Sequence, residues 1–158
     1  MLREIRCERF RTNTIRFSDG LNVVLGDDNA TNSIGKSSLL MVIDFAFGGS
    51  SLVEHNADAI KELGHHHYDI VFDFDGVQRR YRRGTLEPDD VYRCDEDFQP
   101  EAVLALDEYT GLLRAHYGIE LEGLSFRALV GLYARVWGKE NLDVMSLLTR
   151  MTPGFSRA

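Results

Sequence analysis

Apolar and polar positions alternate over the first part of the chain, in the manner of β-strands. The segment LREIRCERF, residues 2–10, has the alternation of a half-buried strand, and NTIRFSDG, residues 13–20, predicts a second strand closed by a Ser-Asp-Gly turn. The run LNVVLG, residues 21–26, is short, apolar and β-branched and ends in glycine, which is typical of a buried strand. We therefore expect successive strands up to residue 26.

Helical spacing replaces this alternation in residues 36–47. The segment contains no helix breaker, and its apolar residues recur along one helix face: Leu39, Leu40, Ile43 and Phe47. Gly48 and Gly49 follow, as glycines do at the C-terminal caps of helices. The pattern thus predicts a strand, a loop and a helix, in that order.

Residues 50–67 are less distinctive. LVEHNADAIKELG, residues 52–64, is compatible with a short helix. The histidine triplet at 65–67 suggests a metal site, but consecutive histidines in a strand point to opposite sides and seldom converge on one ion. A solvated surface position is therefore the favoured interpretation.

The segment YDIVFDFDGVQRRYRRGT, residues 68–85, predicts a β-hairpin. Asp75-Gly76 favours a two-residue type I′ turn between alternating strands. That turn sets the register, in which these pairs face each other: Phe74 with Val77, Asp73 with Gln78, Ile70 with Tyr81, and Asp69 with Arg82. One face then carries Asp69, Asp73, Arg80 and Arg82. The other carries Ile70, Phe72, Phe74, Val77 and Tyr81, with Arg79 and Arg83 among them.

This register divides the arginines of the RRYRR run into two groups. Arg80 and Arg82 share a face with carboxylates and are expected to be structural, because opposite charges pair across strands. Arg79 and Arg83 have no carboxylate on their face. They are candidates for a functional contact, with an arginine extending to solvent from a sheet edge as the alternative.

From Pro100 to residue 150 the chain is expected to be helical. EAVLALDEYTGLLRAHYG, residues 101–118, places on one stripe Val103, Leu106, Thr110, Leu113 and Tyr117. SFRALVGLYARVWGKENL, residues 125–142, begins with a candidate N-cap at Ser125 and has an apolar face through Leu129, Leu132 and Val136. Residues 151–158, MTPGFSRA, predict a flexible tail.

Composition narrows the class of protein. The chain has 158 residues, enough for one domain or half of a larger one, and 44% of them are hydrophobic. It shows no signal peptide and no apolar run long enough for a membrane span, so a cytoplasmic location is expected. Cys7 and Cys94 are far apart in sequence and are expected to be reduced thiols. The net charge of −7 repels nucleic acid, so DNA would be contacted through a local basic patch or a partner.

The stretch GDDNATNSIGKSSLL, residues 26–40, carries the candidate chemistry. A loop that leads into a helix N-terminus offers backbone N–H groups and the positive end of the helix dipole to a phosphate. Gly35 lets the backbone approach the ligand, Lys36 would reach the β- and γ-phosphates, and the Ser37 hydroxyl would bind Mg²⁺. Ser38 can add a hydrogen bond to the α-phosphate.

The first half of this stretch departs from the usual P-loop pattern. Ala30 stands where the first glycine of the pattern belongs, and the nearest earlier glycine is Gly26. Asp27 and Asp28 would repel a phosphate if they pointed inward, so they are expected to face solvent or a partner. The loop is either a variant that begins at Ala30 or an enlarged acidic loop that begins at Gly26.

Together, the strand LNVVLG, the motif NSIGKSS and the helix LLMVIDFAFGG resemble the N-terminal lobe of SMC/RecF/RecN-type ABC ATPases, over about residues 1–85. Their NGSGKS motif matches residues 32–37, with Ser33 and Ile34 in place of its Gly and Ser. The form here looks closest to poorly characterised bacterial members, some of them linked to phage defence. The fold implied is α/β, an ABC/SMC-like P-loop head lobe over residues 1–150. It would have a mixed sheet, a P-loop at 26–38, an antiparallel hairpin at 68–85 and helices at 100–150.

The resemblance also implies a ligand and a partner. ATP would contact Asn32, Ser33, Ile34, Gly35, Lys36, Ser37 and Ser38, with Mg²⁺ on Ser37, and Arg11 matches a basic position near the adenine. Such heads hydrolyse ATP only when a second head contributes a signature motif, and their Walker B strand lies in a C-terminal lobe. The chain has no LSGG-like signature. A C-terminal lobe or partner protein, as a homodimer or hetero-complex, is therefore implied, with a role in DNA repair or anti-phage defence.

Two alternatives remain open. AVLALDE, residues 102–108, mimics a Walker B strand, so the chain could be a self-contained P-loop kinase or NTPase that uses Asp107 and Glu108. Its alanine and leucine content and its continuation as an amphipathic pattern favour a helix instead. The other alternative is a non-catalytic interaction module with a degenerate loop.

Overall fold

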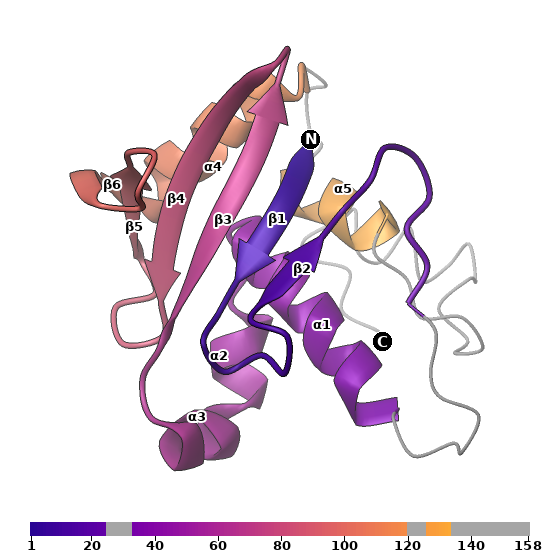
Figure 1. Ribbon diagram of the computed structural model, residues 1–158, viewed down its shortest axis with the longest axis vertical. Helices are drawn as coiled ribbons and strands as arrows, with labels where there is room; N and C mark the ends of the chain where they lie inside the picture. The colour runs from indigo at the N-terminus through magenta and orange to yellow at the C-terminus, as the bar shows by residue number, and fades with distance from the viewer. Residues whose placement is uncertain (25–32, 120–125, 134–158) are drawn as a thin grey trace, which may run out of the picture.

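The computed structural model describes residues 1–24, 33–119 and 126–133 and is α/β. Its sheet has six strands in the order β2-β1-β3-β4-β5-β6 (Figure 1). The strands are β1 Leu2–Arg6, β2 Thr14–Arg16, β3 His67–Phe74, β4 Val77–Gly84, β5 Asp90–Cys94 and β6 Pro100–Ala105. The helices are α1 Ser33–Ala46, α2 Ser51–His55, α3 Ala57–Leu63, α4 Leu106–His116 and α5 Phe126–Tyr133.

The core lies between one face of this sheet and the helices. Alternate strand residues point to that face, and the ones that are buried there include Ile5, Ile70, Phe72, Tyr81, Val91 and Leu104. Helix α1 contributes Val42, Phe45 and Ala46, α4 contributes Tyr109 and Leu113, and α5 contributes Phe126. The antiparallel sheet is thus covered by helices on one side, which fits the hydrophobic alternation of its strands.

The β3–β4 hairpin has the predicted register. Phe74 pairs with Val77, Asp73 with Gln78, Ile70 with Tyr81 and Asp69 with Arg82. The turn residues Asp75 and Gly76 have φ values of 55° and 81°, as a type I′ turn requires. The turn chemistry and the alternation of residues therefore fix this hairpin residue by residue.

The opposite face of the sheet carries polar side chains and a small second cluster. Val71, Cys94 and Phe98 are buried there, with Tyr92 packed beside them. The guanidinium of Arg6 lies 4.8 Å from the centre of the Phe98 ring, which is cation–π geometry. The loop between β5 and β6 thereby folds back over the outer face.

The sheet differs from the mixed sheet that was expected. All strand pairings among the described residues are antiparallel. The expected strand at 21–26 is not formed over the residues that are described: Leu21, Val23 and Val24 are 87%, 64% and 50% exposed. Leu25 and Gly26 lie outside the described residues. Residues 21–24 have no strand beside them in the described chain, and strand structure depends on pairing with a neighbour.

The segment 100–105 was predicted as helix, and this prediction is wrong. It forms β6, which pairs with β5 and places Val103 opposite Tyr92. Backbone hydrogen bonds to β5 outweigh the helix propensity of its alanines and leucine, because tertiary pairing overrides a weak local preference. From Leu106 onward the helix is present as α4, where Leu113 is buried and Thr110 and Tyr117 are partly buried.

Several predictions concern residues beyond those described. Ser125, residues 134–150 and the expected tail at 151–158 all lie outside the described residues. The segment at 52–64 forms two short helices, α2 and α3. Within the described residues, none of the helices combines the length and apolar character that a membrane-spanning helix needs.

Candidate functional site

Helix α1 begins at Ser33, so the GKSS run occupies its first two turns. Gly35 is exposed, and a Cβ added to it would meet no atom within 4 Å. Packing against the described residues therefore does not explain the glycine. Ser37 and Ser38 are half-buried. The loop at 26–32, which includes Asn32, and the side chains of Ser33, Ile34 and Lys36 lie outside what the structure describes.

Arg11 is exposed in the connection between β1 and β2. It has no ion pair or hydrogen bond with the described residues. In Figure 1 this connection and the N-terminal end of α1 both lie in the lower half of the molecule. A nucleotide contact by Arg11 stays a prediction.

Arg83 does not face a ligand, contrary to the expectation for an arginine without a carboxylate. Its exposed fraction is 1%. Its Nη1 donates to the carbonyl oxygens of Phe45 and Gly49 at 2.6 and 2.8 Å, and its Nε donates to the carbonyl of Pro88 at 2.6 Å. Burial lowers the pKa of Arg83 to about 10, so the guanidinium is still charged at neutral pH. This arginine is part of the core.

The other arginines of the hairpin divide differently from the prediction. Arg82 pairs with Asp69, as expected. Arg80 was expected to meet a carboxylate, but its Nη2 donates to the amide oxygen of Gln78 at 2.7 Å. Arg79 is exposed and has no polar partner among the described residues, so it remains a candidate for an outside contact.

Asp107 and Glu108 lie far from the GKSS run. Both are exposed in the first turn of α4. That turn packs on the C-terminal end of α1: a Cβ at Gly48 would lie 2.4 Å from Cγ2 of Thr110 and 3.7 Å from Cδ1 of Leu106. Helix α1 has 14 residues, so its two ends are about 20 Å apart at 1.5 Å per residue. The two carboxylates thus lie near the C-terminal end of α1, whereas Lys36 lies near its N-terminal end.

The histidine triplet is split between core and surface. His65 and His67 are exposed, whereas His66 is buried, so the surface prediction is wrong for His66. The His66 ring lies 2.8 Å from the Gly64 carbonyl through Nδ1 and 3.0 Å from the Tyr68 hydroxyl through Nε2. No group of three His, Cys, Asp or Glu side chains among the described residues could hold a metal ion.

Cys7 and Cys94 are free thiols, as predicted, and burial raises the pKa of both.

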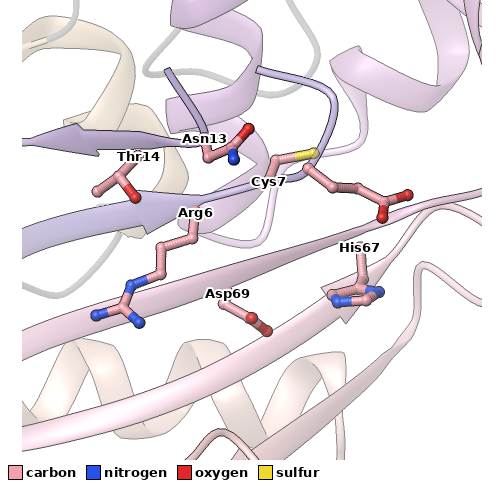
Figure 2. A pocket seen from close by; sticks show the side chains of 7 residues that line it. Arg6, Cys7, Asn13, Thr14, His67 and Asp69 are labelled. Carbon is pink, nitrogen blue, oxygen red and sulfur yellow. The ribbon is translucent and has the colours of Figure 1, made fainter. Parts of the chain in front are cut away.

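A shallow depression lies on the outer face of the sheet, opposite the core (Figure 2). Its volume is about 210 Å³, and it is lined by Arg6, Cys7, Glu8, Asn13, Thr14, His67 and Asp69. Asp69 is already held by Arg82. Because α1 packs on the other face, this depression is separate from the GKSS region. No motif in the sequence indicated it.

Comparisons with protein-family models, with curated proteins and with solved structures gave no match.

Proposed function

We propose that this chain is the ATP-binding lobe of an SMC-like ABC ATPase that acts in DNA repair or anti-phage defence. The observation that carries the proposal is the position of Gly35-Lys36-Ser37-Ser38 in the first two turns of α1. Free N–H groups and the positive end of the helix dipole attract phosphate at such a terminus. A glycine at position 35, where no described atom lies within 4 Å of an added Cβ, supports a ligand in contact with the backbone there.

Each residue of the motif has a role in this proposal. Backbone N–H groups of residues 32–35 would surround the phosphates, and Ser38 would bind the α-phosphate. Lys36 would neutralise the β- and γ-phosphates and stabilise the charge that develops as water attacks the γ-phosphate. Ser37 would hold Mg²⁺, which supplies further positive charge between the phosphates. Arg11 would lie near the adenine.

Two features support a site that a further lobe or a partner completes. The first is the exposed apolar segment Leu21, Val23 and Val24, directly before the loop. The second is α1 itself, in which Leu39, Leu40 and Ile43 are only half-buried although the helix carries just one acidic residue, Asp44. Apolar side chains that remain partly exposed next to one another can mark a surface that contacts another protein. We propose that a C-terminal lobe or partner protein, which supplies the signature motif, the Walker B strand and the catalytic base, contacts this surface.

The location of Asp107 and Glu108 argues against a self-contained enzyme that uses them. A Walker B aspartate acts on the Mg²⁺ beside the P-loop, whereas these carboxylates lie at the other end of α1. If a second lobe completes the site, these two carboxylates need no catalytic role.

Calorimetric titration of the whole chain with Mg-ATP tests the proposal. We expect wild type to bind without turnover, and Lys36→Ala to weaken binding about tenfold or more, because a charge-assisted contact to phosphate is lost. Lys61→Ala is the matched control, since Lys61 is exposed on α3, away from the motif. It should bind like wild type.

The other outcomes select other functions. No Mg-ATP binding by wild type would contradict the proposal and favour a non-catalytic interaction module. Turnover by the isolated chain that is lost in Glu108→Gln would favour the self-contained enzyme. The proposed function requires that ATP turnover begins only when a lobe with the signature motif is added.

A further inference from the structure

The C-terminal end of α1 is held by side chains from distant parts of the chain. The last four carbonyl groups of a helix have no partner inside the helix. Here the hydroxyl of Tyr109, on α4, donates to the Ala46 carbonyl at 2.6 Å. Arg83, on β4, donates to the carbonyls of Phe45 and Gly49. We call Arg83 and Tyr109 the α1 clamp.

The guanidinium of Arg83 is buried beside carbonyl groups rather than a carboxylate. It lies 3.9 Å from the centre of the Phe45 ring, and its hydrogen-bond partners are all backbone carbonyls. The negative end of the α1 dipole is at this position, so the helix itself supplies the compensating charge. Nε also reaches Pro88, in the connection between β4 and β5. One side chain thereby joins α1, β4 and that connection.

The C-terminal half of α1 is held by the core. Val42, Phe45 and Ala46 of this half are buried. Arg127 of α5 forms an ion pair with Asp44 at 3.2 Å, also in this half. These contacts set the position of the C-terminal end of a helix that is about 20 Å long.

From this arrangement we infer that Arg83 is a positioning residue for the phosphate site at the other end of α1. Its hydrogen bond to Phe45 constrains the last turn of the helix, and its hydrogen bond to Gly49 constrains the chain that leaves the helix. The direction of the N-terminal N–H groups, and the place from which Lys36 extends, depend on how this end of the helix is held. The inference rests on the proposed function and adds a residue that never touches the nucleotide.

Two measurements on the whole chain test the inference: the Kd of Mg-ATP, and amide hydrogen exchange over residues 37–42. Arg83→Met keeps much of the side-chain volume and removes the hydrogen bonds. We expect it to weaken Mg-ATP about tenfold and to speed exchange in α1 about tenfold or more, because losing one charged hydrogen bond is worth at least that factor. Arg83→Lys retains the charge but loses the separate Nε donor to the Pro88 carbonyl, so an intermediate result is expected.

Val71→Ala is the matched control for a general loss of stability. Val71 is buried on β3 in the second cluster, with Cys94 and Phe98, on the face of the sheet opposite α1. At a temperature where all variants are folded, this control should leave the Kd and the exchange of residues 37–42 close to wild type. Equal effects of Val71→Ala and Arg83→Met would overturn the inference, because they would reflect stability alone.

The failure of this inference differs from the failure of the proposed function. If wild type binds Mg-ATP and Arg83→Met binds it equally well, the positioning role is wrong and the nucleotide site stands. If wild type does not bind Mg-ATP, the proposed function is wrong and a positioning role toward phosphate is excluded with it. Faster exchange in Arg83→Met would then identify a purely structural clamp.

Discussion

Arg82 lies directly opposite Asp69 in the β3–β4 ladder and donates to both of its carboxylate oxygens, from Nε at 2.6 Å and from Nη2 at 3.1 Å. The hydrogen bond to Asp69 raises the pKa of Arg82 above its ordinary value. Both side chains are partly buried, so solvent screens this pair less than the exposed ion pairs of the surface. The pair therefore contributes to the stability of the central hairpin.

Replacing Arg82 with alanine should lower the free energy of unfolding by about 1–2 kcal/mol, because a hydrogen bond to a charged group is lost. Arg80→Ala is the matched control on the same strand and face, since the side chain of Arg80 hydrogen-bonds to Gln78 and to no carboxylate among the described residues. It should cost less than about 0.5 kcal/mol. Urea denaturation measures both values, and equal losses would show that the Asp69 pair contributes nothing specific.

Gly48 and Gly111 should respond oppositely to alanine. Gly48 has a φ of +90°, and a Cβ there would lie 2.4 Å from Thr110 Cγ2, so Gly48→Ala should cost about 2–3 kcal/mol. Gly111 lies within α4 with no atom within 4 Å of an added Cβ. Gly111→Ala should stabilise the chain by about 0.5–1 kcal/mol through helix propensity. Thermal unfolding of the two variants distinguishes these signs, and a stable Gly48→Ala would mean that α4 does not pack on the end of α1.

Tyr109→Phe should lower the free energy of unfolding by about 1–3 kcal/mol, because the buried Ala46 carbonyl loses its hydroxyl partner. Tyr92 is the control, since it is half-buried and its hydroxyl has no hydrogen bond with the described residues. Tyr92→Phe should change stability by less than about 0.5 kcal/mol. Chemical denaturation compares the two variants. If Tyr109→Phe leaves the free energy of unfolding unchanged, the Tyr109 hydroxyl does not stabilise the end of α1.

Stability should fall as the pH rises above about 10. Burial raises the pKa of Tyr68, Tyr81 and Tyr109, and it raises the pKa of Tyr117 to about 12. In the unfolded chain tyrosine titrates near 10, so between about pH 10 and 12 the unfolded state binds fewer protons and is favoured. The lowered pKa of Arg83, about 10, makes stability rise with pH in this range. This is the contribution of one group, so the four tyrosines outweigh it.

Denaturation curves at about pH 8, 10 and 11 measure this dependence, and tyrosinate absorbance reports when the buried rings ionise. We expect the absorbance to rise together with unfolding rather than before it. Ionisation of all tyrosines in a chain that is still folded would contradict the burial of these hydroxyl groups.

The hairpin was predictable because its information is local. Asp75 and Gly76 specify the turn, and the alternation on either side specifies which side chains face the core, so every predicted pair is present. The same pattern placed Arg83 on the apolar face. An arginine on a core face without an opposing acid was itself a signal of burial, but the carbonyls that it meets, at Phe45 and Gly49, are about 35 residues away in sequence.

The errors arise where long-range partners decide the structure. Residues 100–105 have the alanines and leucine of a helix and become a strand because β5 lies alongside. Residues 21–24 have the composition of a strand and lack a partner among the described residues. The start of α1 near the GKSS run was predictable from the motif and its apolar spacing. The clamp at its other end was not.

The two edges of the sheet are chemically unequal. β6 begins with Pro100, which has no N–H to offer, and continues with the exposed Glu101, two devices that hinder the addition of another strand. β2 is only three residues long, and the chain that leads away from it exposes Leu21, Val23 and Val24. Unwanted self-association of the isolated chain should therefore begin on the β2 side, and one charged gatekeeper such as Val23→Lys should suppress it.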